Sequence, residues 1–600
     1  MSNGKKENKK EKKTKISSRM CRKIRRKDAL KMKFMSEYTF RNFYEVIESR
    51  FGKRVMYRTF RSDESLTYSA FAKEVRAAAS YLLHLGYEKG DRIAIMAESC
   101  PNWMVAYVAA TSVSLVSVPI LPDFSLLEAE GIIKHSGARG IFLNQKQYTK
   151  IHGALEKMEI DLFRIEDLFH IPANIAIEND KDFISSPGIA IASYKVDQKR
   201  LDEMRPEESD LASIIYTSGT TGSSKGVMLS HINILRCADL NTDVYVHVKR
   251  GARVLSILPM SHVYEFTIGQ VLTLLQGVEI TFLGKPPAVS VLLPALAEVR
   301  PHVMLTVPLL IEKVYRAAVL PVLKENEKIR KMLGYPVIGS FVYRVIGKKI
   351  ESTFGHHLKF FGIGGAPLDS EVEYFLYRAR FPYAIGYGLT ETSPLIAGCG
   401  PKKRMHKPGF VGKVVADDTV ILDEKNEEGV GEILVKGVNV MSGYYERDDL
   451  NSEVFTKDGY FRTGDLGYMD KSGFLSIRGR VKTMILGPAG ENIYPEPIES
   501  LINAQEFVEE SLVVPSDGGL LALIKIDIEL MSKKLKIDIS AARKEAEKYV
   551  KELRKTVNAQ LSSYSRLSDT ELQSEPFERT PTQKIKRFLY PKKKKDEKKQ

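Results

Sequence analysis

Residues 214–227 have the sequence IIYTSGTTGSSKGV and are the most informative segment of the chain. The segment begins with apolar residues typical of a buried strand. It continues with three glycines, six Ser or Thr hydroxyls and Lys225. Glycine lets backbone N–H groups approach an anion closely, hydroxyls add donors, and the lysine adds positive charge. The segment therefore predicts a polyphosphate-binding loop at the end of a strand.

This loop is not a P-loop of the GxxxxGK[ST] type. Counting from Gly219, Ser224 stands at the position of the second glycine. Gly226 follows Lys225 and has no hydroxyl for magnesium. A flexible surface turn is the alternative without a function, but so many hydroxyls and a lysine among glycines have no obvious structural use.

The rest of the chain alternates between helix and strand patterns. An amphipathic helix is predicted for 71–85 and a further helix for 103–114, with buried strands at 92–96, 116–120, 139–143 and 213–216. Such alternation is typical of parallel strands joined by crossover helices, which is the α/β class. We therefore expect a multi-layer α/β domain over 35–480.

Two later segments have different patterns. From about residue 409 to 480, short strands and glycine-containing turns predict a small β-rich subdomain, with strands at 419–422, 431–435 and 474–478. Residues 481–590 predict a small α+β C-terminal domain, with strands at 511–514 and 520–527 and a charged helix at 541–557. Residues 1–34 and 591–600 are expected to be basic tails.

Beyond the glycine-rich loop, five further motifs follow in order. They are GGAPL at 364–368, YGLTET at 387–392, YFRTGDLG at 460–467, GRVK at 479–482 and PTQKIK at 581–586. With the loop at 216–226, this series resembles the adenylate-forming enzymes, which include acyl-CoA synthetases, luciferases and peptide-synthetase adenylation domains. The resemblance runs from about residue 38 to 589, nearly the whole chain.

The resemblance implies a reaction in two halves. A carboxylate attacks the α-phosphorus of ATP to give an acyl-adenylate and pyrophosphate, and a thiol then displaces AMP. It implies Mg²⁺ held by Thr217 and Glu391, with ATP and CoA as co-substrates. The residues it assigns to ATP or AMP binding are Thr217, Ser218, Gly219, Thr220, Thr221, Gly222, Lys225, Gly364, Gly365, Ala366, Tyr387, Gly388, Thr390, Asp465 and Arg480.

By the same resemblance Tyr387 stacks on adenine, and Asp465 and Arg480 reach the ribose. Lys584 contacts the carboxylate and the α-phosphate oxygens, where a cation stabilises the charge that develops at phosphorus. Each residue also has an ordinary structural alternative. Tyr387 could instead be a core aromatic, Glu391 a helix-capping acid and Asp465 an Asx-turn residue. Arg480 could instead be a surface arginine, and Lys584 a further residue of the basic tail.

Lys482 matches the family's hinge, about which the small C-terminal domain rotates between the two half-reactions. The rotation withdraws Lys584 and brings the loop at 487–492 toward the acyl site. Gly490 in this loop is therefore expected to act in the thioester step.

Two segments resemble the long-chain fatty-acid branch of the family, LPMSHVYE at 258–265 and RPHVMLTVP at 300–308. They make His262 a candidate catalytic residue near the acyl carboxylate and phosphates, with a helix-capping or core histidine as the alternative. The expected product is a fatty acyl-CoA from a medium- to long-chain acid. A free carrier protein as acceptor and a non-catalytic nucleotide-binding or membrane scaffold remain open alternatives.

The net charge of +15 is concentrated at the two ends. Residues 1–33 carry +12 and residues 584–600 carry +7, so residues 34–583 carry −4. An acidic body argues against nucleic-acid binding, and the N-terminal tail is a candidate tether to an anionic membrane. Four scattered cysteines and no long apolar run predict a cytoplasmic protein, with peripheral membrane contact as an option. The oligomeric state is left open.

Overall fold

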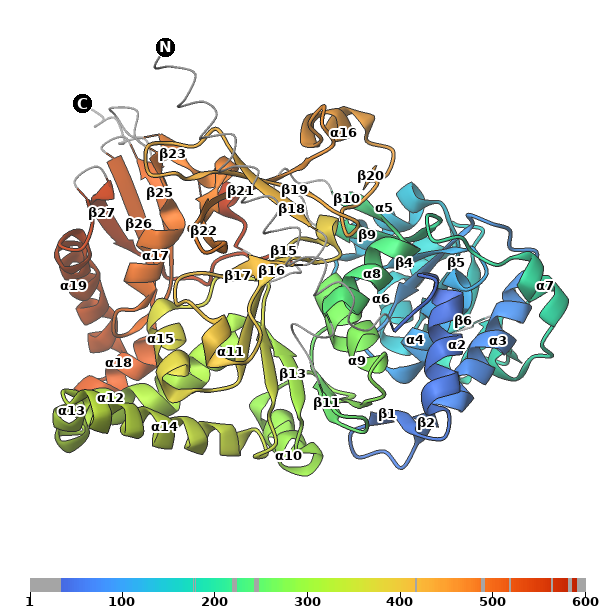
Figure 1. The fold of residues 1–600 in the computed structure, drawn as a ribbon, viewed down its shortest axis with the longest axis horizontal. Coiled ribbons are helices and arrows are strands. Elements are labelled where there is room, and N and C mark those ends of the chain that lie inside the picture. Colours follow the sequence, from blue (N-terminus) through green and yellow to red (C-terminus); the bar gives the residue numbers. More distant parts are fainter. Residues whose placement is uncertain are drawn as a thin grey trace, which may run out of the picture.

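The structure is a computed structural model that describes residues 34–590, except 176, 178–179, 218–223, 242–247, 416–417, 487–491, 517–518, 563–564 and 581–584. It has two large sheets covered by helices and a smaller C-terminal part (Figure 1). The α/β class with a small α+β part is therefore confirmed. The predicted roles of Ser218 to Gly222, Gly490 and Lys584, and of both tails, lie outside the described residues.

The first sheet has nine strands. Their order is β20 (Gly443–Tyr444), β10 (Lys225–Ser230), β9 (Leu211–Thr217), β4 (Val116–Pro119), β3 (Arg92–Met96), β5 (Ala138–Leu143), β6 (Asp161–Arg164), β7 (Phe169–Ile171) and β8 (Ile189–Ala190). From β9 to β6 all pairs are parallel, whereas β10 returns antiparallel to β9. The parallel centre is the one that the alternating pattern predicts.

Helices beside this sheet bury apolar faces. They include α2 (Phe40–Phe51), α3 (Tyr68–His84), α4 (Pro101–Thr111), α5 (Leu126–Ser136), α6 (Gln145–Leu155), α7 (Gln198–Glu203) and α8 (His231–Asn241). Helix α3 begins where the Thr67 side chain accepts a hydrogen bond from the Ala70 N–H, and it contains the predicted helix as far as His84, with Leu85 as its C-cap. In α4 every residue from Trp103 to Thr111 is buried, so this helix lies inside the domain.

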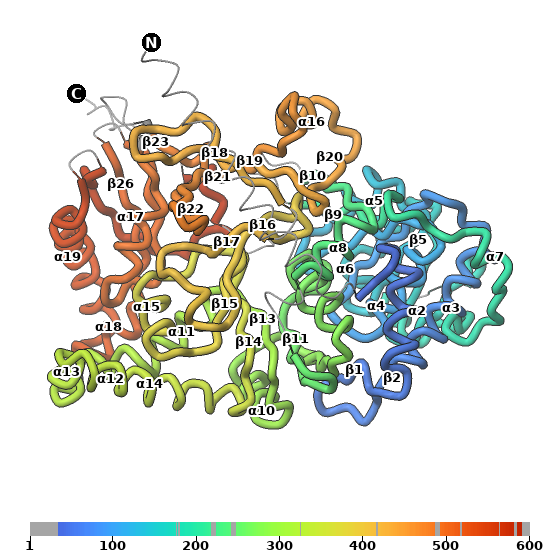
Figure 2. The backbone as a smooth tube through the Cα atoms, viewed as in Figure 1, coloured from blue at the N-terminus to red at the C-terminus, as the bar shows by residue number. Residues whose placement is uncertain are grey.

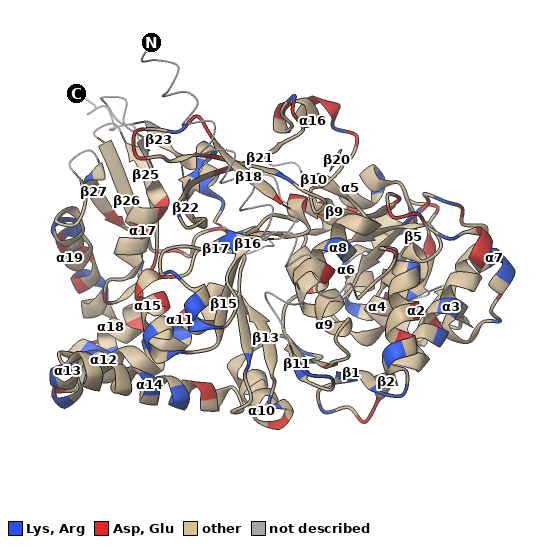
Figure 3. Ribbon diagram, in the orientation of Figure 1, with Lys and Arg blue, Asp and Glu red and all other residues tan. Residues whose placement is uncertain are grey.

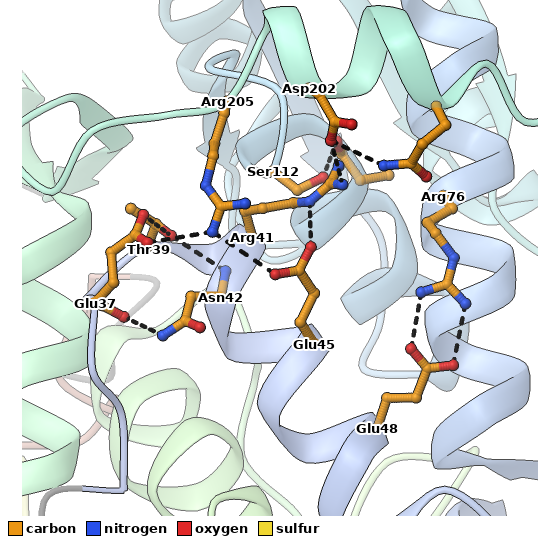
Figure 4. A network of polar contacts seen from close by, with 12 residues as sticks. Glu37, Thr39, Arg41, Asn42, Glu45, Glu48, Arg76, Ser112, Asp202 and Arg205 are labelled. Carbon is orange, nitrogen blue, oxygen red and sulfur yellow. Dashed lines mark hydrogen bonds and ion pairs between the residues drawn. The ribbon is translucent and has the colours of Figure 1, made fainter.

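Helix α2 is fixed by a polar network (Figure 4). The Arg41 side chain is only 3% exposed and donates to Glu45 and Asp202. Arg76 on α3 donates to both carboxylate oxygens of Glu48 on α2, at 2.8 and 3.0 Å. A buried guanidinium needs such partners, because an unpaired one would be costly to desolvate. The network therefore orients α2 against its neighbours.

The second sheet has thirteen strands. Their order is β18 (Thr419–Asp423), β19 (Gly431–Lys436), β21 (Phe461–Met469), β22 (Phe474–Arg480), β17 (Gly412–Val414), β16 (Leu395–Gly398), β15 (Tyr383–Gly388), β14 (Phe360–Ile363), β13 (Val303–Thr306), β11 (Arg253–Ser256), β12 (Glu279–Phe282), β1 (Val55–Thr59) and β2 (Ser65–Thr67). It is parallel from β15 to β1 and antiparallel from β16 to β18. The strands predicted for 409–480 therefore continue the parallel sheet through β16.

The C-terminal part contains a three-stranded sheet, a short two-stranded sheet and helices. Its elements are β23 (Ile485–Leu486), β24 (Asn492–Ile493), α17 (Pro495–Asn503), β25 (Val508–Ser516), β26 (Gly519–Ile526), α18 (Ile528–Leu535), α19 (Ile539–Asn558) and β27 (Leu567–Leu572). It lies beside the helices that flank the second sheet (Figure 2). Arg316 holds it there by donating to the carbonyl oxygens of Val508 and Asn503, both at 2.8 Å.

Within the described part of the chain, no helix has the length and apolar character needed to cross a membrane.

Candidate nucleotide and metal site

Strand register places two predicted phosphate-site residues opposite each other. Thr217 is the last residue of β9, and it pairs with Lys225, the first residue of β10. The glycine-rich loop joins these two ends of an antiparallel pair. A hydroxyl and an ammonium therefore stand on the two sides of the loop, as a polyphosphate site requires.

Glu391 comes to the same place from a distant part of the chain. It lies in the short 3-10 helix η5 (Thr390–Thr392), and its Oε1 accepts a 2.8 Å hydrogen bond from the Tyr444 hydroxyl. Tyr444 pairs with Val227 across β20 and β10, and its ring lies 5.0 Å from the Lys225 Nζ. Tyr444 therefore connects Lys225 to Glu391.

No motif in the sequence marks Tyr444, so sequence reasoning missed it. Its phenol is buried, and burial together with the Glu391 carboxylate raises its pKa above the ordinary value. The hydroxyl therefore stays protonated and donates to Glu391. This bond fixes the orientation of the Glu391 carboxylate.

The donor set fits Mg²⁺. Among the described residues, Glu391 Oε2 has no hydrogen-bond or ion-pair partner, and no cluster of three or more His, Cys, Asp or Glu side chains could hold a metal. Mg²⁺ usually binds through one or two protein oxygens and completes its shell with water and phosphate. One carboxylate oxygen and the Thr217 hydroxyl would supply that minimal set.

Burial and the nearby Lys482 lower the pKa of Lys225. Lys482 lies in η7 (Val481–Thr483), directly after β22, at the predicted hinge. Two ammonium groups near each other favour an anion between them, because an anionic phosphate would stabilise both charges. The predicted phosphate lysine and the predicted hinge lysine are therefore electrostatically coupled.

A second cluster joins the three residues predicted for adenine and ribose. Asp465 on β21 is 4% exposed and lies opposite Arg480 on β22. Its Oδ1 accepts from Arg480 Nε at 3.0 Å, and its Oδ2 accepts from the Tyr387 hydroxyl on β15 at 2.9 Å. Burial and the Asp465 carboxylate raise the pKa of Tyr387. Asp465 therefore has partners on two other strands. Neither an Asx-turn role for Asp465 nor a free surface position for Arg480 requires such partners.

Replacing Asp465 with asparagine is expected to weaken ATP binding. The change keeps the shape of the side chain and removes the charge that holds Arg480, and a hydrogen bond to a charged group contributes about 1.5–3 kcal/mol. We expect KM for ATP to rise by about tenfold or more. Steady-state kinetics with varied ATP measure this rise.

The matched control is Asp470→Asn, since Asp470 pairs with Lys407 at 2.6 Å just beyond β21. This control should leave KM for ATP unchanged. Equal effects of the two substitutions would remove Asp465 from the nucleotide site.

The two glycine motifs allow close backbone contacts. A Cβ at Gly364 would lie 3.1 Å from the Tyr264 ring, and one at Gly388 would lie 1.6 Å from the Pro394 carbonyl oxygen. Gly365 has a φ of +86°, and Ala366 beside it is exposed. Side chains at Gly364 or Gly388 would therefore displace the strand ends that carry the predicted adenine site.

His262 occupies the start of the π-helix η3 (Tyr264–Val271). Its Nδ1 accepts a 3.2 Å hydrogen bond from the Tyr264 N–H, and its carbonyl accepts from the Phe266 N–H at 3.0 Å. These bonds place His262 in the turn that leads into η3. A catalytic role for His262 stays a prediction.

The AMP-binding enzyme family model matches residues 44–445. This match spans the glycine-rich loop, the adenine motif and Tyr444. The chain belongs to the AMP-binding enzyme family. The predicted adenylate-forming family and the expectation of an enzyme are thereby confirmed.

Curated relatives of this AMP-binding enzyme have related names. The chain is 28% identical over 487 residues to the long-chain-fatty-acid–CoA ligase FadD15 of Mycobacterium bovis, covering 77% of this chain and 78% of the relative. It is 29% identical over 512 residues to the long-chain-fatty-acid–CoA ligase ACSBG2 of Rattus norvegicus, covering 80% and 74%.

Solved structures share the fold of this AMP-binding enzyme. ATP-bound MatB from Rhodopseudomonas palustris superposes with a TM-score of 0.69 at 22% identity, covering 92% of this chain and 98% of MatB. The o-succinylbenzoate CoA synthetase MenE from Bacillus subtilis, in complex with its acyl-adenylate, gives 0.69 at 20% identity, covering 92% and 98%.

Proposed function

We propose that this protein activates a medium- to long-chain fatty acid with ATP and transfers the acyl group to CoA. In the first step a fatty carboxylate oxygen bonds to the α-phosphorus, and pyrophosphate leaves. In the second step the CoA thiol releases its proton to water and its sulfur attacks the acyl carbon, so that the bond between this carbon and the phosphate oxygen breaks and AMP leaves. The observation that carries the proposal is the convergence of Thr217, Lys225 and Glu391 around Tyr444.

The residues of this cluster have separate tasks in the proposed reaction. Lys225 and the loop hold the phosphates, and Asp465 with Arg480 holds the ribose. Thr217 and Glu391 would hold Mg²⁺, which, when bound, offsets the negative charge of the phosphates. Since charge moves from the α-phosphate toward the departing pyrophosphate, fixed cations lower the barrier without covalent help.

The fatty-acid substrate is supported by two observations. The relatives named above are long-chain-fatty-acid–CoA ligases, and the segment at 258–265 resembles that branch. The segment forms the turn into η3, and Tyr264 packs against Gly362 and Gly364 at the end of β14. An acyl tail would need an apolar channel near this point, for which residues 263–271 and 385–396 are the candidate walls.

One assay tests the proposal against its alternatives. The protein is incubated with ATP, Mg²⁺ and a panel of fatty acids of increasing length, with and without CoA. We expect CoA-dependent release of AMP together with a thioester. Adenylate formation without transfer to CoA would instead indicate a carrier-protein acceptor, and no turnover with any acid would indicate a non-catalytic scaffold.

A further inference from the structure

Helix α14 (Pro336–Thr353) leaves a row of apolar side chains exposed. Val337 is 84% exposed, Phe341 65% and Val345 51%. Their spacing of four residues places them on one side of the helix. Gly339, Val342, Gly347 and Ile350 are buried on the other side. An exposed apolar row of this kind is typical of an interaction surface.

Apolar exposure continues beyond the row. Ile338 on the same helix is 42% exposed, and Tyr335 and Met332 just before it are 63% and 39% exposed. Helices α13 (Glu327–Leu333), α14 and α10 (Val289–Val299) lie along one edge of the molecule, at the bottom of Figure 1. The row is therefore at the periphery, where a large flat partner can reach it.

Four cations lie near one another beside α14: Arg344, Arg378, Arg380 and Lys403. Arg344 precedes Val345 on α14. Arg378 belongs to α15 (Ser370–Ala379), which packs against α14, and its guanidinium lies 5.0 Å from the Tyr343 ring. In Figure 3, blue Lys and Arg segments occur around α14 and α15 together with red Asp and Glu segments. Arg344 and Arg378 therefore lie beside the apolar row, and Arg380 and Lys403 lie near them.

These four cations have no ion-pair partner among the described residues, although many arginines elsewhere do. The Arg344 Nε is buried without a hydrogen-bond partner. Burial and the three arginines lower the pKa of Lys403. No described acidic residue forms an ion pair with this cluster of positive charge, which favours an external anion.

We propose that this α14 patch, composed of Val337, Phe341 and Val345 with Arg344, Arg378, Arg380 and Lys403, docks the protein on an anionic phospholipid bilayer. The apolar side chains enter the boundary between headgroups and acyl chains. The arginines and the lysine contact lipid phosphates, which guanidinium groups bind well. A protein partner would have to supply an apolar groove bordered by acids, whereas an anionic bilayer offers both to any peripheral surface.

The α14 patch is separate from the proposed nucleotide site, and no residue is shared between them. Lipid binding therefore succeeds or fails independently of the fatty-acid ligase activity. The patch also differs from the basic tail at 1–33, because it combines apolar and positive groups. Salt weakens a purely electrostatic tether much more than an apolar contact.

Co-sedimentation of the full chain with vesicles tests the docking surface. The vesicles contain phosphatidylcholine alone or with phosphatidylglycerol, at moderate and at high salt. One variant is Val337→Ser/Phe341→Ser/Val345→Ser, and another is Arg378→Gln/Arg380→Gln/Lys403→Gln. The matched control, Leu127→Ser/Ile184→Ser/Ile189→Ser, removes three exposed apolar side chains elsewhere, which are 78%, 44% and 44% exposed.

We expect the serine variant to need at least about tenfold more lipid for half-maximal binding, at moderate and at high salt, because the apolar side chains that would be buried are lost. The glutamine variant should show a weaker preference for phosphatidylglycerol at moderate salt than the parent, and the control should bind like the parent. Parent-like binding by both α14 variants would overturn the proposal. Self-association of the parent protein through α14 would also overturn the proposal, if the serine variant became monomeric while its vesicle binding stayed unchanged.

Discussion

Replacing Lys584 with alanine is expected to abolish the exchange of pyrophosphate between ATP and the acyl-adenylate. Removing one group that stabilises transition-state charge typically costs about 10²–10³ in rate, and we expect a loss at least that large. The second half-reaction does not need this lysine under the rotation model. Transfer from a preformed acyl-adenylate to CoA should therefore stay within a few-fold of the parent.

The neighbourhood of Lys584 supports this expectation. Arg587, three residues later, pairs with the buried Glu499, whose other oxygen accepts from the Val513 N–H at 2.7 Å. This contact attaches the segment after Lys584 to the C-terminal sheet. The segment is thus part of a folded unit, in contrast to the basic-tail alternative.

Lys586→Ala is the matched control, because Lys586 is two residues away and its Nζ lies 3.9 Å from Glu578. It should retain normal exchange. Thermal unfolding of each variant separates catalytic loss from misfolding. Normal pyrophosphate exchange by a folded Lys584→Ala variant would refute the assignment.

Replacing Glu391 with glutamine is expected to reduce adenylation by about 10² or more. Glutamine keeps an oxygen that can accept from Tyr444 but loses the negative charge that a hard divalent cation requires. We therefore also expect a higher Mg²⁺ concentration for half-maximal activity. Pyrophosphate exchange across a Mg²⁺ titration measures both effects.

Tyr444→Phe gives a graded comparison with this variant. It removes the 2.8 Å bond to Glu391 and keeps the aromatic ring beside Lys225. The net value of one hydrogen bond is about 0.5–1.5 kcal/mol, so the expected loss is roughly two- to tenfold. An unchanged Mg²⁺ requirement in Glu391→Gln would exclude Glu391 as a metal ligand.

The predictions from sequence were strongest where the chemistry is local. Glycines, hydroxyls and Lys225 within one short segment indicate a phosphate loop, because they act on an anion directly from neighbouring positions. The helical spacing of apolar residues, and the alternation of helix and strand segments, likewise predicted α3, the central parallel strands and α19. Helix α19 buries Ala542, Ala546, Val550, Leu553 and Val557 on one face, as its spacing requires.

Features that depend on strand register could not be predicted in this way. Asp465 meets Arg480 because β21 and β22 are adjacent, and Tyr387 reaches the same carboxylate because the antiparallel strands continue the parallel sheet. The catalytic role that a motif predicts for His262 stays a prediction, and the structure shows its Nδ1 accepting a hydrogen bond from the Tyr264 N–H.

The order of residues along the chain thus specified the fold class, the family and the chemical types at the site, since those follow from local composition and spacing. Tertiary structure alone revealed Tyr444 between Lys225 and Glu391, and the exposed side of α14. The reason is that the first half of α14 carries apolar residues on more than one side. Periodicity cannot say which side packs on the protein, and only packing against α15 leaves Val337, Phe341 and Val345 outside.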